Sequence, residues 1–155
     1  MFGLIKLITV IQRVKNSKVE VEGQIVGEIG YGLNILLGIE KLDNKEDVDF
    51  LTKKISKFRI FPDGNKNMNL SIQDINGSAL VISQFTLCAD WRKGNRPGFS
   101  TSASPEIAND LYEYFIQNLK LHNISVKTGV FGAKMDVYIL NDGPVTFVLN
   151  SKEYK

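Results

Sequence analysis

The sequence predicts an α+β fold in which a strand-rich mixed sheet, or partial β-barrel, is covered by two helices. Apolar, β-branched runs fill the first third of the chain and return in its second half, and two segments interspersed with them have the spacing of amphipathic helices. Strands combined with a few covering helices are typical of two packed layers around one core. Because the 155 residues contain no repeat, low-complexity tract or linker, we expect residues 1–155 to form a single domain with a core of about residues 6–150.

Four strands are expected before residue 40. The run Leu7–Val14 is apolar and β-branched, and we interpret it as a first strand that a few additional residues precede. Val19-Glu20-Val21 and Gln24–Ile29 flank Glu22-Gly23, which is typical of a tight hairpin turn. A glycine-containing turn then leads into the apolar run Leu33–Ile39, which predicts a buried strand.

The first helix is expected to begin at Asp43. Glu46 follows three residues later, which is the spacing of a capping box. Apolar residues at helical spacing after this point predict a single buried stripe: Val48, Leu51, Ile55 and Phe58.

The second helix is expected to begin at Ser104-Pro105-Glu106. A hydroxyl side chain at the cap and proline in the first helical position are both typical of a helix N-terminus. Apolar residues that recur every fourth position predict its buried face: Ile107, Leu111, Phe115 and Leu119.

Strands account for most of the remaining chain. We expect them at Ala79–Leu87, Ser125–Thr128, Met135–Leu140 and Val145–Leu149. Between the first of these and the second helix, Asp90–Ala103 is a long polar loop with glycine and proline. Ordered loops of this length tend to be functional, so we regard this loop as a candidate functional segment.

Composition limits the environment and the partners of the chain. Charged residues interrupt every apolar stretch well before 18 residues, so no transmembrane helix is expected, and the N-terminal stretch lacks the basic start and cleavage site of a signal peptide. Cys88 is the only cysteine, which is compatible with the reducing cytoplasm. The net charge of +2 is low for a protein that wraps a long duplex, whereas a protein that binds one end of an RNA needs no more.

The residue inventory excludes several classes of enzyme. His122 is the only histidine, and its position just past a helix favours a solvated residue at a helix C-terminus over a catalytic base. One histidine and one cysteine do not suit a zinc site, and no P-loop or dinucleotide-binding motif is present. We interpret Cys88 as a small core or interface residue. An enzyme with this sequence is expected to need no metal and no cofactor, and to rely on orientation and backbone dipoles.

Two segments carry more specific information. From the residues alone, Ser83-Gln84-Phe85-Thr86-Leu87 is a strand end rich in β-formers, and Asn141-Asp142-Gly143-Pro144-Val145-Thr146 contains a hairpin turn before a strand that starts with proline. Together, however, the two segments resemble those of the D-aminoacyl-tRNA deacylases. Further stretches that are similar to this family follow in order from about Leu7 to Leu149: Ile11-Gln12-Arg13-Val14, Gly38, Arg59-Ile60-Phe61, Met68-Asn69, Arg92-Lys93-Gly94-Asn95-Arg96-Pro97 and Gly129 through Met135.

The resemblance implies a pocket for the aminoacyl end of tRNA. Its catalytic segment would consist of Ser83, Gln84, Phe85 and Thr86, with the main-chain N–H groups of Phe85 and Thr86 polarising the ester carbonyl. The terminal adenine would lie among Phe131, Gly132 and Met135. Taken alone, Phe131 is also compatible with an ordinary core position.

The resemblance also implies a homodimer with active sites at the subunit interface. Gly143-Pro144 would form a cis peptide that one subunit inserts into the pocket of the other, where it would select the chirality of the amino acid. Arg13 and Gln12 would support this motif. The expected partner is the 3′ end of aminoacyl-tRNA, with no membrane and no DNA involved.

The implied reaction is hydrolysis of the ester in D-aminoacyl-tRNA, and also in glycyl-tRNA, with L-aminoacyl-tRNA spared. Either Thr86 Oγ attacks the ester, or backbone donors hold the carbonyl while the ribose 2′-OH orients or activates water. We favour the second mechanism, since no evident base lies near Thr86 in the sequence. The alternatives are a non-catalytic dimeric RNA-end-binding module that uses residues 91–99, and a hydrolase of small acyl esters. The binding module would protect charged tRNA where an enzyme would discharge it, and the hydrolase of small esters would ignore the RNA portion.

A few positions depart from the common pattern of the family. Met1 to Ile5 add length before the usual start, and Trp91 and Gly98 stand where smaller and hydroxylated residues, respectively, are expected. These differences concern the expected pocket mouth and its RNA contacts. A sister family that uses a trans Gly-Pro replaces the Ser-Gln-Phe-Thr segment, and Ser83 and Phe85 argue against it.

Overall fold

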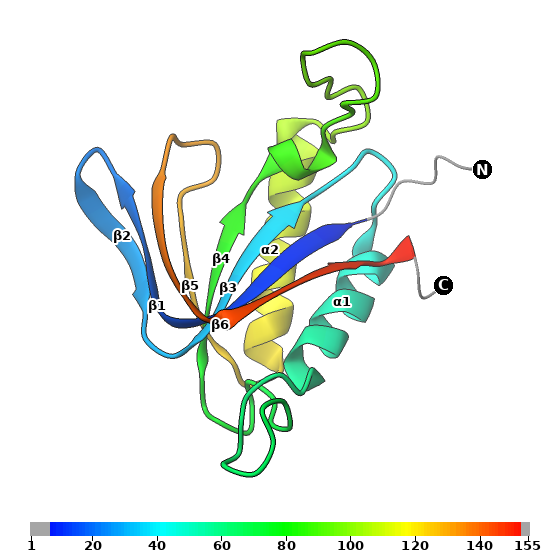
Figure 1. The fold of residues 1–155 in the computed structure, drawn as a ribbon. Coiled ribbons are helices and arrows are strands. Elements are labelled where there is room, and N and C mark those ends of the chain that lie inside the picture. The colour runs from blue at the N-terminus through cyan, green and yellow to red at the C-terminus, as the bar shows by residue number, and fades with distance from the viewer. Residues whose placement is uncertain (1–6, 153–155) are drawn as a thin grey trace.

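The computed structural model describes residues 7–152, so the additional residues Met1 to Ile5 lie outside the described part. The elements follow one another in the chain as β1 (Ile8–Val21), β2 (Gln24–Ile29), β3 (Gly32–Gly38), α1 (Lys45–Lys57), β4 (Ser78–Ser83), the short 3-10 helix η1 (Phe85–Cys88), α2 (Pro105–Leu121), β5 (Ser125–Thr128) and β6 (Asp136–Asn150). Figure 1 shows α1 and α2 side by side against one face of the sheet. The apolar residues that they bury there form the main core with β1, β3 and β4.

The six strands form one mixed sheet in the order β2-β1-β3-β4-β5, with β6 paired to β1. The long strand β1 pairs with β3 through its first half and with β2 through its second half, while β6 runs antiparallel along both halves. The outer strands β2 and β5 approach each other so closely that a Cβ atom on Gly27 would lie 2.3 Å from the Thr128 carbonyl oxygen. The sheet is therefore nearly closed into a barrel, and the predicted fold class is confirmed.

The predicted hairpin joins β1 to β2. Val21 pairs with Gln24, and the two turn residues both have positive φ, 51° at Glu22 and 78° at Gly23. Positive φ at both central positions matches the right-handed twist of the flanking strands. One difference from the expectation is that residues 8–14 and 19–21 belong to a single strand, which begins one residue after Leu7.

Helix α1 begins one residue later than predicted. Asn44 is the cap: its Oδ1 accepts from Asp47 N at 3.2 Å, and Asp47 Oδ2 accepts from Asn44 N at 2.9 Å. Asp43 instead accepts from the backbone N–H of Glu40 at 2.7 Å. Since acidic or amide residues occur at both 43 and 44, with a carboxylate three residues after each, the pattern alone does not separate the two registers.

The apolar stripe of α1 is confirmed at Val48, Leu51 and Ile55, all of which are buried. Phe58, the last member of the predicted stripe, is instead the C-cap beyond the helix. Its ring packs edge-on against Phe147 of β6, with 5.1 Å between the centroids.

Helix α2 begins as predicted, with Ser104 Oγ accepting from Ile107 N at 3.4 Å and Pro105 in the first turn. Leu111, Phe115 and Leu119 are buried together with Tyr112 and Ile116, but Ile107 is 47% exposed and was wrongly assigned to the buried face. A spacing of four residues drifts by about 40° per step around a helix of 3.6 residues per turn, so Ile107 lies well off the centre of the stripe.

Candidate active site

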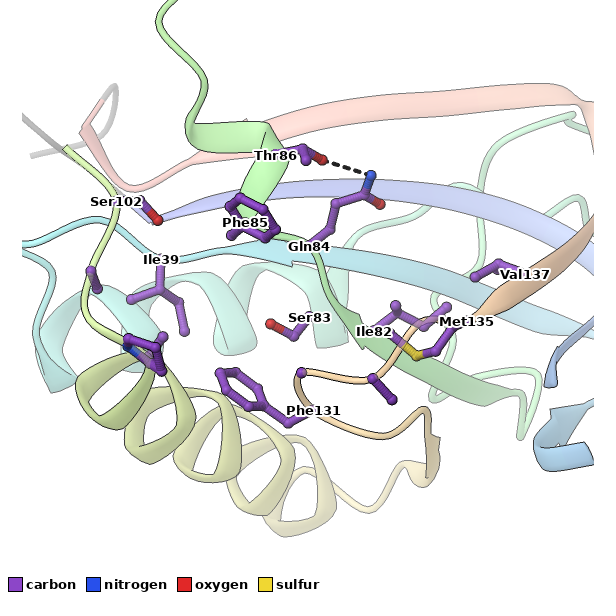
Figure 2. A pocket seen from close by; sticks show the side chains of 15 residues that line it. Ile39, Ile82, Ser83, Gln84, Phe85, Thr86, Ser102, Phe131, Met135 and Val137 are labelled. Carbon is purple, nitrogen blue, oxygen red and sulfur yellow. Dashed lines mark hydrogen bonds between the residues drawn. The ribbon is translucent and has the colours of Figure 1, made fainter. Parts of the chain in front are cut away.

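A pocket of about 540 Å³ lies where β4 ends. Its walls come from the 84–86 segment, the first turn of α2 and the segment that leads into β6. Figure 2 shows the Ser83 hydroxyl directed into the space between the Phe85 and Phe131 rings. The lining combines seven residues predicted from the sequence with others that were not: Ser83, Gln84, Phe85, Thr86, Phe131, Gly132 and Met135, joined by Ile39, Ile82, Ser102, Ala103, Pro105, Ala108, Ala133 and Val137. A mainly apolar cavity with a few polar groups is typical of a small-molecule site.

The predicted catalytic segment, Ser83 to Thr86, leads from the end of β4 into a short 3-10 helix, and the predicted strand does not continue to Leu87. Strand β4 ends at Ser83, and residues 85–88 form η1. The absence of a side chain on Gly38 permits this, because a Cβ atom there would lie 2.9 Å from Leu87 Cβ and 3.2 Å from Cys88 Sγ. A glycine on β3 thus allows η1 to pack against the sheet.

The start of η1 leaves two backbone donors without acceptors. Gln84 N donates to Leu37 O at 2.8 Å, and Leu87 N donates to Gln84 O at 3.2 Å. Between them, the N–H groups of Phe85 and Thr86 donate to no acceptor within residues 7–152. Adjacent free N–H groups of this kind are available to bind an external oxygen that carries negative charge.

The side chain of Thr86 is held by an amide. Gln84 Nε2 donates to Thr86 Oγ1 at 3.0 Å, as the dashed line in Figure 2 shows. A carboxamide is not a base, so it does not take the proton that a hydroxyl nucleophile must lose. His122 cannot serve either, because it caps the far end of α2, whose 17 residues separate it from the pocket by about 25 Å at 1.5 Å per residue.

The segment 141–146 is a bulge within one continuous strand, and the predicted hairpin turn between two strands is wrong. Gln12 pairs with Thr146 and Val14 pairs with Asn141, so residues 142–145 stand opposite Arg13 alone. Both halves of β6 run antiparallel to β1, and the chain never reverses. The Gly143–Pro144 bond is cis. Gly143 has φ +145°, and a Cβ atom there would lie 2.5 Å from Val145 Cγ2.

Arg13 connects this bulge to the body of the protein. Its Nε donates to Asp142 O at 3.0 Å and lies 3.3 Å from Asp142 Oδ2, while one terminal nitrogen donates to Ile60 O at 2.7 Å and to Asn67 O at 3.3 Å. Burial and the nearby Asp142 carboxylate raise the pKa of Tyr31, whose hydroxyl also contacts Asp142. The buried guanidinium therefore holds the bulge through contacts on both sides.

Asn141 closes the base of the bulge. Its Nδ2 donates to Val145 O at 3.2 Å and to Thr146 Oγ1 at 3.0 Å, and its Oδ1 accepts from Val145 N at 2.7 Å. Gln12, in contrast, accepts from Asn34 Nδ2 at 3.4 Å, and within residues 7–152 no side-chain hydrogen bond joins it to residues 142–145. Asn141 belonged to a motif seen in the sequence, but only the structure reveals what its side chain does.

The predicted chirality motif does not line the pocket of its own chain. Gly143 and Pro144 are exposed, and neither is among the residues around the 540 Å³ cavity. Within residues 7–152, the structure thus separates the predicted residues into a pocket and an exposed bulge that Arg13 supports.

The family model described as D-Tyr-tRNA(Tyr) deacylase matches residues 10–150. A D-aminoacyl-tRNA deacylase from Thermosipho africanus is 58% identical over 144 residues, which cover 93% of this chain and 97% of that protein. The chain belongs to the D-aminoacyl-tRNA deacylase family. A solved structure titled c-Myc DNA unwinding element binding protein is 36% identical and superposes with a TM-score of 0.85, over 92% of this chain and 97% of that one. A probable eukaryotic D-amino acid tRNA deacylase, only 14% identical, shares the fold with a TM-score of 0.83 over 94% and 100% of the two chains.

The far wall of the deacylase-family pocket is aromatic and apolar. The Phe131 ring contacts Tyr112 of α2, with 5.6 Å between the centroids, so Phe131 packs against the core and lines the cavity at once. Met135 occupies the space above Gly129, where a Cβ atom would lie 2.6 Å from its sulfur. The glycine therefore fixes where the thioether sits on this wall.

The remaining candidate groups lie outside the chemistry of the pocket. Burial, with the nearby charges of Glu40 and Asp43, raises the pKa of the Cys88 thiol to about 12, so it is protonated at neutral pH and fits the core position expected for it. Within residues 7–152, no group of three or more His, Cys, Asp or Glu side chains is arranged so that it could hold a metal ion. Over the same part of the chain, neither helix is long and apolar enough to cross a membrane.

Proposed function

We propose that this pocket binds the aminoacyl end of tRNA and that the N–H groups of Phe85 and Thr86 stabilise the charge that develops on the ester carbonyl oxygen. Hydrolysis of D-aminoacyl-tRNA is the activity that membership of the family assigns. The two backbone donors without acceptors are the observation that supports this mechanism. Because they are fixed before substrate binds, they stabilise the transition state without reorganisation.

Water is the nucleophile in the proposed reaction. The ester is already activated, and the 2′-OH of the terminal ribose lies next to it, where it can orient or activate the attacking water. The Gln84–Thr86 contact supports this route over a covalent one, since Thr86 Oγ1 accepts from an amide and has no base beside it. No metal ion or cofactor takes part.

The terminal adenosine is proposed to bind against Phe131, Gly132 and Met135. An aromatic ring and a thioether provide the flat, polarisable surface on which a base stacks. Ser83 would then face the aminoacyl group from the opposite side of the cavity. A volume of about 540 Å³ lies in the range of sites that bind ligands of this size.

The active unit is proposed to be a homodimer in which the bulge of one copy completes the pocket of the other. Two observations support the homodimer. Gly143 and Pro144 are exposed in their own chain. Strand β6 also carries exposed apolar side chains at Tyr138, Leu140 and Val148. Large apolar side chains in one strand are typical of a surface that another protein covers. A dimer of single-domain chains in the cytoplasm, where charged tRNA is present, is the assembly we propose.

Chirality would be selected by exclusion. With the amino group and carbonyl of the bound ester fixed, the Gly143-Pro144 backbone would occupy the direction that an L side chain needs. A backbone segment cannot rotate away as a side chain can. It contacts only the side on which an L side chain would lie, so it requires no particular side chain on the D side. Varied D-residues and glycine should therefore be accepted, and L-residues rejected.

Discharge of D-tyrosyl-, glycyl- and L-alanyl-tRNA by the pure protein tests this proposal. The first two should be hydrolysed and the third should persist. Efficient hydrolysis of L-alanyl-tRNA or complete inertness toward glycyl-tRNA would contradict selection by exclusion. Protection of all three from spontaneous hydrolysis would instead indicate the non-catalytic RNA-end-binding module, and hydrolysis of small acyl esters without regard to RNA would indicate a general esterase.

A further inference from the structure

The loop between η1 and α2, residues 89–104, leaves the active-site pocket and returns to it. It begins directly after Cys88, and Ser102 and Ala103 near its end line the pocket. Backbone hydrogen bonds hold the returning segment: Ala103 N donates to Ile39 O at 3.1 Å, and Lys41 N donates to Thr101 O at 2.9 Å. In Figure 1 the green loop projects beyond the end of α2. The loop is therefore a structured extension of the pocket rim.

A second hollow, of about 510 Å³, lies within this loop. A pair of backbone hydrogen bonds between Asp90 and Gly98, at 2.7 and 2.8 Å, closes its base. The lining contains three cationic side chains and one carboxylate: Asp90, Arg92, Lys93, Arg96, Gly98 and Ser100. An excess of positive charge in a concave site suits an anionic ligand.

The three cations have different roles. Arg92 donates to both carboxylate oxygens of Asp90, at 2.9 and 2.8 Å, and holds the pKa of that carboxyl well below its usual range. This pair stabilises the turn. Lys93 and Arg96 form no ion pair within residues 7–152. The charge available to a ligand therefore comes mainly from these two side chains.

Aromatic rings accompany the cations. Trp91 is 76% exposed, and Phe99 packs against Phe85 of η1 with 4.9 Å between the ring centroids. Cations with an exposed ring beside them are the combination by which proteins bind single-stranded nucleic acid, because the cations contact phosphates and the ring stacks on a base. The Phe85–Phe99 contact couples this surface to the catalytic segment.

We propose that residues 89–101 bind the single-stranded 3′ end of tRNA, with Lys93 and Arg96 contacting backbone phosphates and Trp91 stacking on a base upstream of the terminal adenosine. The inference rests on the proposed function, which puts that adenosine in the pocket. Asp90 follows Thr86 by four positions, so their Cα atoms lie at most about 14 Å apart. At about 3.4 Å per stacked nucleotide, this distance corresponds to at most about four nucleotides, so the loop lies within the span of the unpaired end of the acceptor.

Trp91 makes the contact directly measurable, because it is the only tryptophan of the chain. The experiment titrates the protein with uncharged tRNA and follows tryptophan fluorescence, so it needs no turnover. Binding should quench the emission, whereas adenosine alone and a blunt RNA duplex without a 3′ overhang should not. Quenching by the blunt duplex to the same extent would overturn a single-strand site.

Salt dependence tests the two cations. Each phosphate contact to a single strand contributes about −0.7 to the slope of log affinity against log salt, so a fourfold rise in salt should weaken binding about sevenfold more in the wild type than in Lys93→Ala/Arg96→Ala. The matched control is Lys53→Ala/Lys57→Ala, which removes the same charge from exposed positions on α1. An equal reduction of the salt-dependence slope in the two double variants would mean that overall charge, and not the loop, determines the salt dependence of binding.

Activity provides the independent readout. The loop pair should raise KM for D-tyrosyl-tRNA and leave hydrolysis of the D-tyrosyl ester of adenosine unchanged. Trp91→Ala should weaken binding of the tRNA substrate by about fivefold or more, and Trp91→Phe should restore that binding. Slower hydrolysis of both substrates, or dissociation of the variant into smaller species, would overturn the proposal. A wild type that binds tRNA with quenching but hydrolyses neither ester would contradict the proposed function and leave the RNA site supported.

Discussion

Replacement of Asn141 by alanine should loosen the bulge that carries Gly143-Pro144. The side chain makes three hydrogen bonds across its base, two to Val145 and one to Thr146. Each hydrogen bond contributes about 1 kcal/mol to stability, so the three together contribute about 3 kcal/mol. We expect the native arrangement of residues 142–145 to lose about 3 kcal/mol relative to other conformations.

This loss should appear as reduced fidelity. If the bulge is the wall that excludes L side chains, a loss of about 3 kcal/mol lowers the ratio of D to L turnover by up to about 100-fold, since 1.4 kcal/mol corresponds to a factor of ten. The assay compares kcat/KM for D-tyrosyl- and L-tyrosyl-tRNA in the wild type and in Asn141→Ala. Thr146→Val is the graded control, because it removes one of the three hydrogen bonds and preserves the shape of the side chain. Its effect should be less than about tenfold.

Two results would refute the reasoning. A variant that unfolds at lower temperature but keeps the wild-type D to L ratio would show that the bulge does not select chirality. Equal loss of both activities would show that the bulge positions substrate and excludes nothing. Measurement of Tm beside the kinetics separates global destabilisation from the local effect.

Three other predictions address the pocket itself. Thr86→Ala should keep most of the deacylation rate while a 2′-deoxy terminal adenosine abolishes it; a loss of about a thousandfold in the variant, about 4 kcal/mol of barrier, would identify Thr86 as a nucleophile. Deacylation should continue in excess EDTA, and activity that is lost there and recovered with zinc or magnesium would contradict a metal-free mechanism. Gly38→Ala should displace η1 and lower kcat/KM, because its Cβ would lie 2.9 Å from Leu87 Cβ, whereas Gly30→Ala, with nothing within 4 Å, should behave as the wild type.

The parts of the fold that depend on local sequence were predictable. Both helices, the β1–β2 hairpin and the buried strand β3 follow from apolar spacing and turn residues that lie close together in the chain. The start of α1 was misplaced by one residue because Asp43 and Asn44 both satisfy the capping pattern. Ile107 was misassigned because a period of four is only an approximation to the helix.

The errors at the site share a different cause. Asn141 to Pro144 is locally a strong turn signal, but pairing with β1 on both sides keeps β6 continuous. Residues 85–88 are good β-formers, yet they turn into a 3-10 helix that packs where Gly38 leaves room, and Gly38 is distant in sequence. Contacts between segments that are remote in sequence determine both structures, and local sequence patterns carry no information about such contacts.

The same limit explains which site residues were found. The segments 83–86 and 131–135 were identified by their resemblance to a family, and the structure brings them into one cavity. Ser102, Pro105 and Ala108 have no chemical signature, and only the return of the long loop to the pocket reveals them. Arg13 was found as a supporter of the motif, but its anchors at Ile60 and Asn67 depend on the tertiary fold.

The continuity of β6 has a genetic consequence for the proposed homodimer. The strand begins at the pocket of its own chain, where Val137 lines the cavity, and in the proposed homodimer its bulge would reach toward the partner. If the bulge excludes L side chains, chains that carry a defective bulge should hydrolyse D- and L-aminoacyl-tRNA alike, and chains that carry a defective pocket should hydrolyse neither. When the two alleles are co-expressed, each mixed dimer joins the sound pocket of one chain to the sound bulge of the other, so selective hydrolysis of D-aminoacyl-tRNA should return in that dimer.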